Sequence, residues 1–327
     1  MYIHFNELKK ELNRVLIGLS FDEHKANLCA KIFAENSLDG VHSHGLNRFP
    51  GFVSAVKEKL INPGAEPELI ESHHALETWE GNLGPGMYNA SLSMSRAIEI
   101  ASLYGIGCVV IKNTNHWMRG GNYGWQAANA GYIGFCFTNT IANVTPWGGT
   151  DPRLGNNPVV IAVPKKDGHV VLDMAVSQYS FGKLQEFKVR GEILPVFGGY
   201  DLKGQLSNDP GKIIESQRGL PIGFWKGSGL SLMVDLLLTA LSGGRSTAEI
   251  TRSKNESGVS QCFICIKQPQ LHDSLINEII RFTKTSSLPT DSTKVYYPGE
   301  KTLSRRKEHT AKGIPVNEKV WQQVLNL

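Results

Sequence analysis

The sequence has no long hydrophobic run. Its strongest apolar stretch, Leu230 to Ser242, is shorter than the roughly 18 residues that a membrane-spanning helix needs, and Asp235 interrupts it. The N-terminus lacks the apolar segment of a secretory signal. Cysteine is scarce, with only 5 residues scattered over 327, which argues against a disulfide-rich secreted scaffold. These absences predict a soluble cytoplasmic protein without a membrane partner.

The chain also lacks a large excess of positive or of negative charge. The chain has 34 Lys and Arg against 30 Asp and Glu, a formal net charge of +4. Proteins that bind nucleic acid usually carry a basic stripe, so no nucleic-acid partner is predicted. The hydrophobic content of 41% is typical of globular proteins. At roughly 100–200 residues per domain, the length predicts about two domains.

Several well-known site motifs are missing. No Gly-x-Gly-x-x-Gly fingerprint, phosphate-binding Gly-x-x-x-x-Gly-Lys loop or Gly-x-Ser-x-Gly elbow occurs in the chain. The Cys-x-x-Cys motif at Cys262 and Cys265 lies in a predicted strand, where positions three apart face opposite sides of the sheet. We therefore predict no metal site, and we interpret these cysteines as packed core residues.

Hydrophobic periodicity divides the chain into helical ends and a strand-rich middle. The spacing of Leu8, Leu12 and Leu16 predicts an N-terminal helix, and Asp22 is placed to cap a second one. Short apolar runs bounded by Gly or Asn predict buried strands near 107–111, 133–137, 158–163, 169–173 and 259–266. We therefore predict an α+β fold with a helical domain of residues 1–75 and 300–327. Residues 76–299 would form a sheet domain, with a substrate cleft between the two domains.

Two polar segments contain candidate catalytic groups. His42-Ser43-His44-Gly45-Leu46-Asn47-Arg48 predicts a helix start in which Ser43 caps and His44 and Arg48 share a face. An imidazole can donate a proton near neutral pH, and a guanidinium suits a carboxylate; the alternative is a solvated helix entry. The segment from Asn113 to Gly121 follows a predicted strand and contains His116. A binding loop and a structural turn are equally compatible with that second segment.

A third candidate segment is rich in glycine. The run from Gly223 to Gly229 contains Trp225 and Lys226 and precedes an apolar helix. Backbone N–H groups at such a helix start can bind a phosphate, although glycine turns before helices are common in any protein. We interpret Asp235, inside the apolar helix, as a structural residue.

Taken together, these segments resemble the lactate/malate dehydrogenase-like oxidoreductases that lack a Rossmann domain. The resemblance covers almost the whole chain in the family's order. It is carried by Ser43-His44-Gly45 with Arg48, Asn115-His116, Gly120-Gly121, the run from Leu220 to Leu230, Val234-Asp235, Leu241 to Gly244, and Tyr297 to Glu300. It explains the missing fingerprint, because these enzymes hold NAD(P) on a mostly antiparallel sheet of their own type.

The resemblance implies hydride transfer to C2 of a 2-oxo acid, with a sugar-derived acid as the expected substrate. It places the proton donor at His44, with Arg48 at the substrate carboxylate and His116 as a polarising or orienting group. NADH is the expected cofactor and NADPH the alternative, and a homodimer is implied. The implied cofactor contacts are His169, Val170, Val171, Leu172, Asp173, Met174, Ala175, Trp225, Lys226, Gly299, Glu300 and Lys301.

The sequence is also compatible with two alternatives. One is a simpler 2-hydroxy-acid dehydrogenase that acts on malate, lactate or ureidoglycolate. The other is a protein that binds the dinucleotide without catalysis. That second reading predicts loss of His44 or of the Lys226 turn, and both are present.

Overall fold

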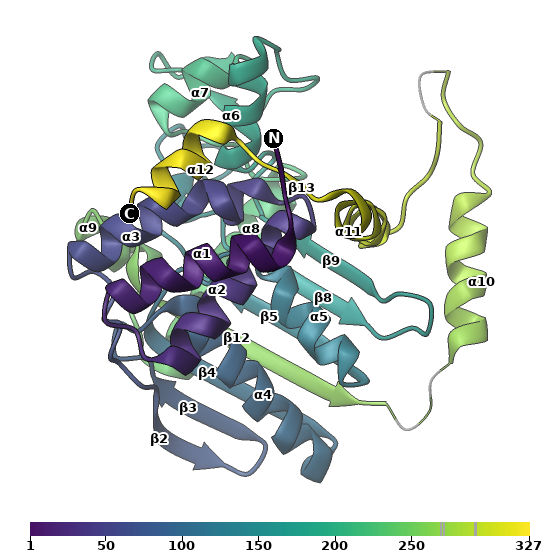
Figure 1. Ribbon diagram of the computed structural model, residues 1–327. Coiled ribbons are helices and arrows are strands. Elements are labelled where there is room, and N and C mark those ends of the chain that lie inside the picture. Colours follow the sequence, from purple (N-terminus) through teal and green to yellow (C-terminus); the bar gives the residue numbers. More distant parts are fainter. Residues whose placement is uncertain (269, 271, 291–292) are drawn as a thin grey trace.

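The computed structural model describes residues 1–268, 270, 272–290 and 293–327. Its centre is a seven-stranded sheet with the order β2-β3-β4-β12-β5-β8-β9 (Figure 1). Only β3 and β4 run parallel, and the other neighbours are antiparallel. The predicted α+β fold with a mostly antiparallel sheet is therefore confirmed. The sheet strands are β2 (Glu68–His73), β3 (Leu76–Glu80), β4 (Ile106–Asn115), β5 (Tyr132–Thr138), β8 (Val159–Val163), β9 (Val170–Met174) and β12 (Ser257–Lys267).

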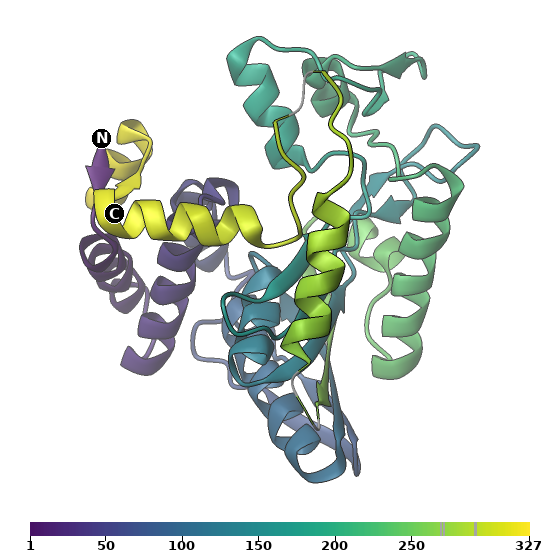
Figure 2. The ribbon, with the colours of Figure 1, turned by 90° about the vertical axis from the view of Figure 1, so that its right-hand side faces the viewer.

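Helices cover both faces of this sheet (Figure 2). Val109 on β4 packs with α4 (Gly86–Tyr104) and α5 (Gly121–Asn129), whereas Val110 packs with α8 (Trp225–Ser242) on the other face. Cys265 and Cys262 divide between the same two clusters. Alternate residues of a strand point to opposite faces, so the two thiols of the Cys-x-x-Cys motif do not converge.

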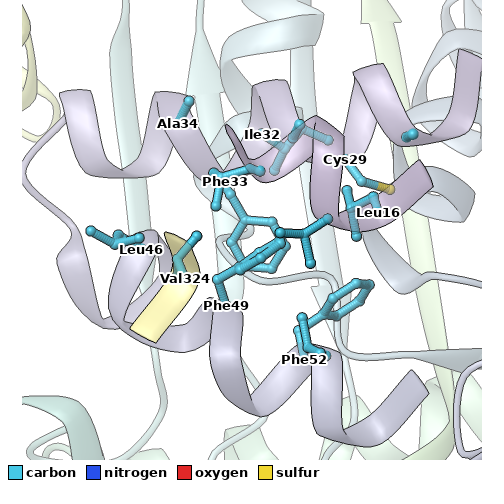
Figure 3. Close-up of a cluster of buried hydrophobic side chains, with 14 of the residues drawn as sticks. Leu16, Cys29, Ile32, Phe33, Ala34, Leu46, Phe49, Phe52 and Val324 are labelled. Atoms are coloured by element: carbon cyan, nitrogen blue, oxygen red, sulfur yellow. The ribbon is translucent and has the colours of Figure 1, made fainter. Parts of the chain in front are cut away.

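A separate helical cluster is built from both ends of the chain. It contains α1 (Phe5–Gly18), α2 (Glu23–Leu38), α3 (Phe49–Lys57) and α12 (Glu318–Leu325). Phe33 packs edge-on against Phe49 and Phe52, with ring centroids 5.1 and 5.3 Å away (Figure 3). Each fully buried Leu or Phe contributes about 1.5–3 kcal/mol relative to an exposed one, so this cluster holds the two chain ends together.

The chain ends also meet through β1 (Tyr2–Ile3), which pairs with β13 (Ile314–Pro315). Asp22 caps α2 by accepting a hydrogen bond of 2.9 Å from the backbone N–H of Lys25. β2 belongs to the large sheet, so the domain limit at residue 75 falls between two of its strands. The exact division into domains stays a prediction.

The remaining elements lie around the sheet and the helical cluster. α11 (Glu300–Lys312) leads back to the helical cluster, and α10 (Asp273–Lys284) lies at the periphery, where Asp273 contacts Lys166 and Lys284 contacts Glu300 (Figure 1). In the described part of the chain, no helix is both long and apolar enough to cross a membrane. The other short elements are β6 (Ala142–Val144), β7 (Leu154–Gly155), α6 (Phe181–Arg190), β10 (Gly199–Tyr200), β11 (Leu206–Ser207), α7 (Pro210–Ser216) and α9 (Thr247–Arg252).

Candidate active site

A cavity of about 640 Å³ lies between the helical cluster and the sheet. Its volume is within the 300–1,000 Å³ usual for ligand pockets. His44 lines it from the helical side and Val171 and Asp173 from β9, while the loop around Gly299 covers a third side. Thr140 and Asn156 add polar groups, and the Thr140 hydroxyl donates to Asn156 Oδ1 over 2.8 Å.

The segment around His44 differs from the predicted helix start. His42–His44 and Leu46–Arg48 are two short 3₁₀ turns, and α3 begins only at Phe49. Ser43 makes no capping hydrogen bond; its hydroxyl lies 3.0 Å from Nδ1 of His44. The prediction that Ser43 caps a helix with His44 and Arg48 on one face is therefore wrong.

Packing against α2 explains this local geometry. A side chain at Gly45 would overlap Ser37, whose hydroxyl accepts a hydrogen bond of 2.9 Å from the N–H of Leu46. Asn36 donates to the carbonyl of His44 over 2.8 Å. The turn that presents His44 is therefore fixed by contacts across the fold, and a regular helix does not form.

Two imidazoles meet at the floor of the cavity. The rings of His44 and His116 are stacked, with centroids 5.7 Å apart and planes 15° from parallel. Nδ1 of His116 accepts a hydrogen bond of 3.0 Å from the backbone N–H of Met118, so neutral His116 carries its proton on Nε2. Burial lowers the pKa of His116 well below 6.5, with further lowering by His44 and Arg48. His116 is therefore a neutral hydrogen-bond donor beside His44.

Burial also lowers the pKa of His44 below 6.5, and the charge of Asp173 opposes this shift. The Nε2 atom of His44 makes no hydrogen bond within the described residues. When His44 is protonated, Nδ1–H can donate to Ser43 and Nε2–H is left for a ligand. This arrangement suits a group that delivers one proton and is then neutral.

Arg48 lies outside the main cavity. It lines a smaller adjoining cavity of about 170 Å³ that shares His116 and Met118 with the larger one. Its guanidinium is exposed and makes no hydrogen bond or ion pair with the residues that the structure describes. Arg48 therefore does not share a helical face with His44, but its charge reaches His116 and is free for an anionic ligand group.

Half of the expected cofactor residues line the main cavity, and the other half do not. Val171, Leu172, Asp173, Ala175, Gly299 and Lys301 form part of its wall. Val170 and Met174 pair with β8, and His169 Nε2 meets Asn129 Oδ1 at 2.9 Å. Burial raises the pKa of Glu300, but the ammonium groups of Lys284 and Lys294, each 2.7 Å away, lower it to about 2.

Trp225 and Lys226 form the first turn of α8 and do not line the cavity. The preceding Ile222 donates its N–H to the carbonyl of Val176, so the glycine-rich turn begins close to the cavity edge. Trp225 is 66% exposed. Asp235 accepts hydrogen bonds from Asn139 and from the N–H of Thr247, both of 2.9 Å, in a structural role.

Asp39, Arg119 and Arg306 form an ion-pair network that sequence reasoning did not find. Arg119 binds Asp39, and its Nε lies 3.4 Å from Asp173. Arg306 binds both oxygens of Asp39, at 2.7 and 2.8 Å. The network thus joins α2, α11 and the cavity wall. Arg119 lies in the polar segment from Asn113 to Gly121, but no local pattern marks Asp39.

Two glycines after Arg119 allow close packing at the cavity wall. A side chain on Gly120 would meet Trp117 and Val160, and one on Gly121 would meet Asp173. The N–H of Gly121 donates to Asp173 Oδ2 over 2.9 Å. The backbone angle of Gly120 is ordinary, with φ of −59°, so close approach and not positive φ requires glycine there.

Comparison with known proteins agrees with this architecture. The family model described as malate/L-lactate dehydrogenase matches residues 3–325. The 2,3-diketo-L-gulonate reductase of Pasteurella multocida is 43% identical, with 100% of both chains covered. That of Citrobacter koseri is 42% identical over 99% of both chains.

Solved structures show the same fold. Malate dehydrogenase from Pyrococcus horikoshii aligns with a TM-score of 0.89 and 29% identity, over 99% of this chain and 93% of the other. Malate dehydrogenase from Entamoeba histolytica aligns with a TM-score of 0.93 and 24% identity, over 100% of this chain and 98% of the other. At this identity the similarity concerns the fold alone. The chain belongs to the malate/L-lactate dehydrogenase family of oxidoreductases.

Proposed function

We propose that the protein reduces 2,3-diketo-L-gulonate to 3-dehydro-L-gulonate, with NADH as the preferred cofactor. The observation that carries the proposal is the stacked His44–His116 pair, both rings of which line a cavity of about 640 Å³. The names of the curated relatives, at 41–43% identity over almost the whole chain, support the substrate.

The residues around the large cavity fit a nicotinamide dinucleotide. Bound there, the cofactor would supply a hydride to C2 of the substrate. β9 and the Gly299–Lys301 segment would hold it, with Trp225 and Lys226 at the edge nearest Ile222. Lys301, whose ammonium lies 4.3 Å from the ring centre of Tyr296, is a cation of this wall that could bind a 2′-phosphate, which keeps NADPH as the alternative.

The side chains then have separate tasks. His44 donates a proton from Nε2 to the oxygen at C2, while its Nδ1 is held by Ser43. His116 donates a hydrogen bond from Nε2 and orients the carbonyl. Arg48 reaches the substrate from the smaller cavity and binds the carboxylate through its planar guanidinium.

The test is NADH consumption by the purified protein with 2,3-diketo-L-gulonate, with NADPH, pyruvate and oxaloacetate in parallel. Rapid turnover of the sugar acid, with kcat/KM higher for NADH than for NADPH, supports the proposal. Turnover of pyruvate or oxaloacetate alone favours the simpler 2-hydroxy-acid dehydrogenase. NADH binding without turnover of any acid favours the non-catalytic alternative.

The direction of the His44 pKa shift predicts how the rate depends on pH. Reduction requires protonated His44, so kcat/KM for reduction falls as pH rises through a pKa below 6.5. Oxidation requires neutral His44, so its kcat/KM rises through the same pKa. The measurement is a kcat/KM profile in both directions over about pH 5 to 9. A reductive rate that increases toward alkaline pH would contradict the assigned role.

We also propose the homodimer that the resemblance implies. α8 presents six large apolar side chains that are 39–53% exposed: Leu230, Leu232, Met233, Leu236, Leu237 and Leu241. Large exposed apolar patches on a soluble chain mark association surfaces. The predicted location in the cytoplasm is consistent with the five free cysteines.

The dimer proposal predicts that Leu236→Asp converts the protein to a monomer. A charge at the centre of an apolar contact loses its hydration on association, so the dimer is disfavoured. Light scattering coupled to size exclusion measures the mass, and Ile17→Asp on the exposed side of α1 is the matched control. A wild-type monomer, or an equal effect of both variants, would refute this interface.

A further inference from the structure

Glu256 is, beside Arg48, a second charged side chain that lines the smaller cavity. It lies between α9 and β12, and its cavity is shared with His116, Arg48 and Asn255. It is therefore next to the proposed reaction centre, because His116 lines both cavities. No sequence pattern marked this residue.

The carboxylate of Glu256 has few hydrogen-bond partners for its position. Its side chain is partly buried, and among the residues described it accepts one hydrogen bond, a long one of 3.4 Å from the N–H of Ile141. It forms no ion pair within that part of the chain. Burial raises the pKa of Glu256, and the charge of Arg48 lowers it. A partly desolvated carboxylate with so few partners is costly unless a donor reaches it.

Neighbouring amides do not supply that donor. Asn115, which shares the cavity, uses its side-chain N–H groups for the carbonyls of Leu60, Leu83 and Gly84. The cavity therefore holds one free cation, Arg48, and one under-bonded anion, Glu256, within the described residues. A molecule with a carboxylate at one end and hydroxyl groups beyond it complements both charges.

We propose that Glu256 accepts hydrogen bonds from the hydroxyl groups of the substrate beyond C2 and so selects polyhydroxylated 2-oxo acids. This inference rests on the proposed function. Hydroxyl groups donate short, strong hydrogen bonds to a carboxylate. The methyl group of pyruvate offers no such donor, and the second carboxylate of oxaloacetate would meet a like charge.

The test compares Glu256→Gln with wild type at saturating NADH. We measure kcat/KM for 2,3-diketo-L-gulonate, and kcat/KM or the competitive inhibition constant for pyruvate and oxaloacetate. Replacing a charged acceptor by an amide should lower kcat/KM for the sugar acid by about 10- to 100-fold. The values for pyruvate should change less than about twofold, and oxaloacetate should bind more tightly, because the like charge is gone.

Glu215→Gln, on the exposed face of α7, is the matched control and should behave as wild type. Glu256→Asp keeps the charge but shortens the side chain by one methylene group. We expect this variant, too, to lose kcat/KM selectively for the sugar acid. An equal loss for all three acids would show that Glu256 only positions Arg48 and would overturn the inference. Wild-type activity in both Glu256 variants would overturn it as well. Wild type that is inactive with the sugar acid would instead refute the proposed function itself.

Discussion

His44→Ala is expected to lower kcat/KM for reduction by about 10²- to 10⁴-fold, the usual contribution of a general acid. That loss corresponds to roughly 3–5 kcal/mol of transition-state stabilisation. The reason is geometric: His44 faces the cavity, Ser43 holds its Nδ1 at 3.0 Å, and its neighbour His116 is neutral. Steady-state NADH consumption measures the rate, and quenching of protein fluorescence checks that NADH still binds.

The neighbouring imidazole provides a matched control for this experiment. His42 belongs to the same 3₁₀ turn but lies near His309, with ring centroids 6.4 Å apart, and does not line the cavity. His42→Ala should therefore retain most of the activity. The His44→Ala variant should also lose the pH dependence that protonation of His44 imposes. Comparable losses in both variants would show that the turn is needed only for folding.

Much of the fold follows from local sequence patterns. The alternation of Val109 and Val110 between two faces follows directly from the period of a strand, and Asp22 caps α2 where the sequence places it. The order of the strands does not follow in this way. β12 lies between β4 and β5 although more than a hundred residues separate it from either strand. Such long-range pairing leaves no local signal.

In the candidate site, too, some features follow from the local sequence and others do not. His44 and His116 stood out because each lies in a polar segment beside an apolar element, but only the folded chain shows their rings stacked. The 3₁₀ turn at His44 results from the contact of Gly45 with Ser37 on α2. Helix propensity depends on local sequence only, so it cannot predict this contact. Glu256 faces Arg48 from a segment about two hundred residues later in the chain. Local sequence patterns therefore identify residues of reactive types, but they do not show which charged side chains surround those residues in the folded chain.

The ion-pair network around Asp39 leads to the second large prediction. Asp39 has a side-chain exposure of 1%, and it binds both Arg119 and Arg306. Arg119 is itself 8% exposed, so loss of the carboxylate would leave its buried guanidinium with only the longer contact of 3.4 Å to Asp173 as an ion pair among the described residues. Breaking a buried ion pair from one side costs about 3–5 kcal/mol, and we expect Asp39→Ala to lower the free energy of unfolding by that amount.

Loss of this ion-pair network should also weaken binding of NADH at the proposed cofactor site. Arg119 lies 3.4 Å from Asp173 and lines the large cavity, so a displaced guanidinium would disturb the wall beside β9 and raise KM for NADH. Urea unfolding followed by circular dichroism gives the stability, and NADH titration gives the KM. Glu11→Ala, which removes an exposed pair of 2.8 Å with Arg14, is the control and should cost less than about 1 kcal/mol. If Asp39→Ala were no more destabilising than this control, the network would not join the helical cluster to the cavity wall.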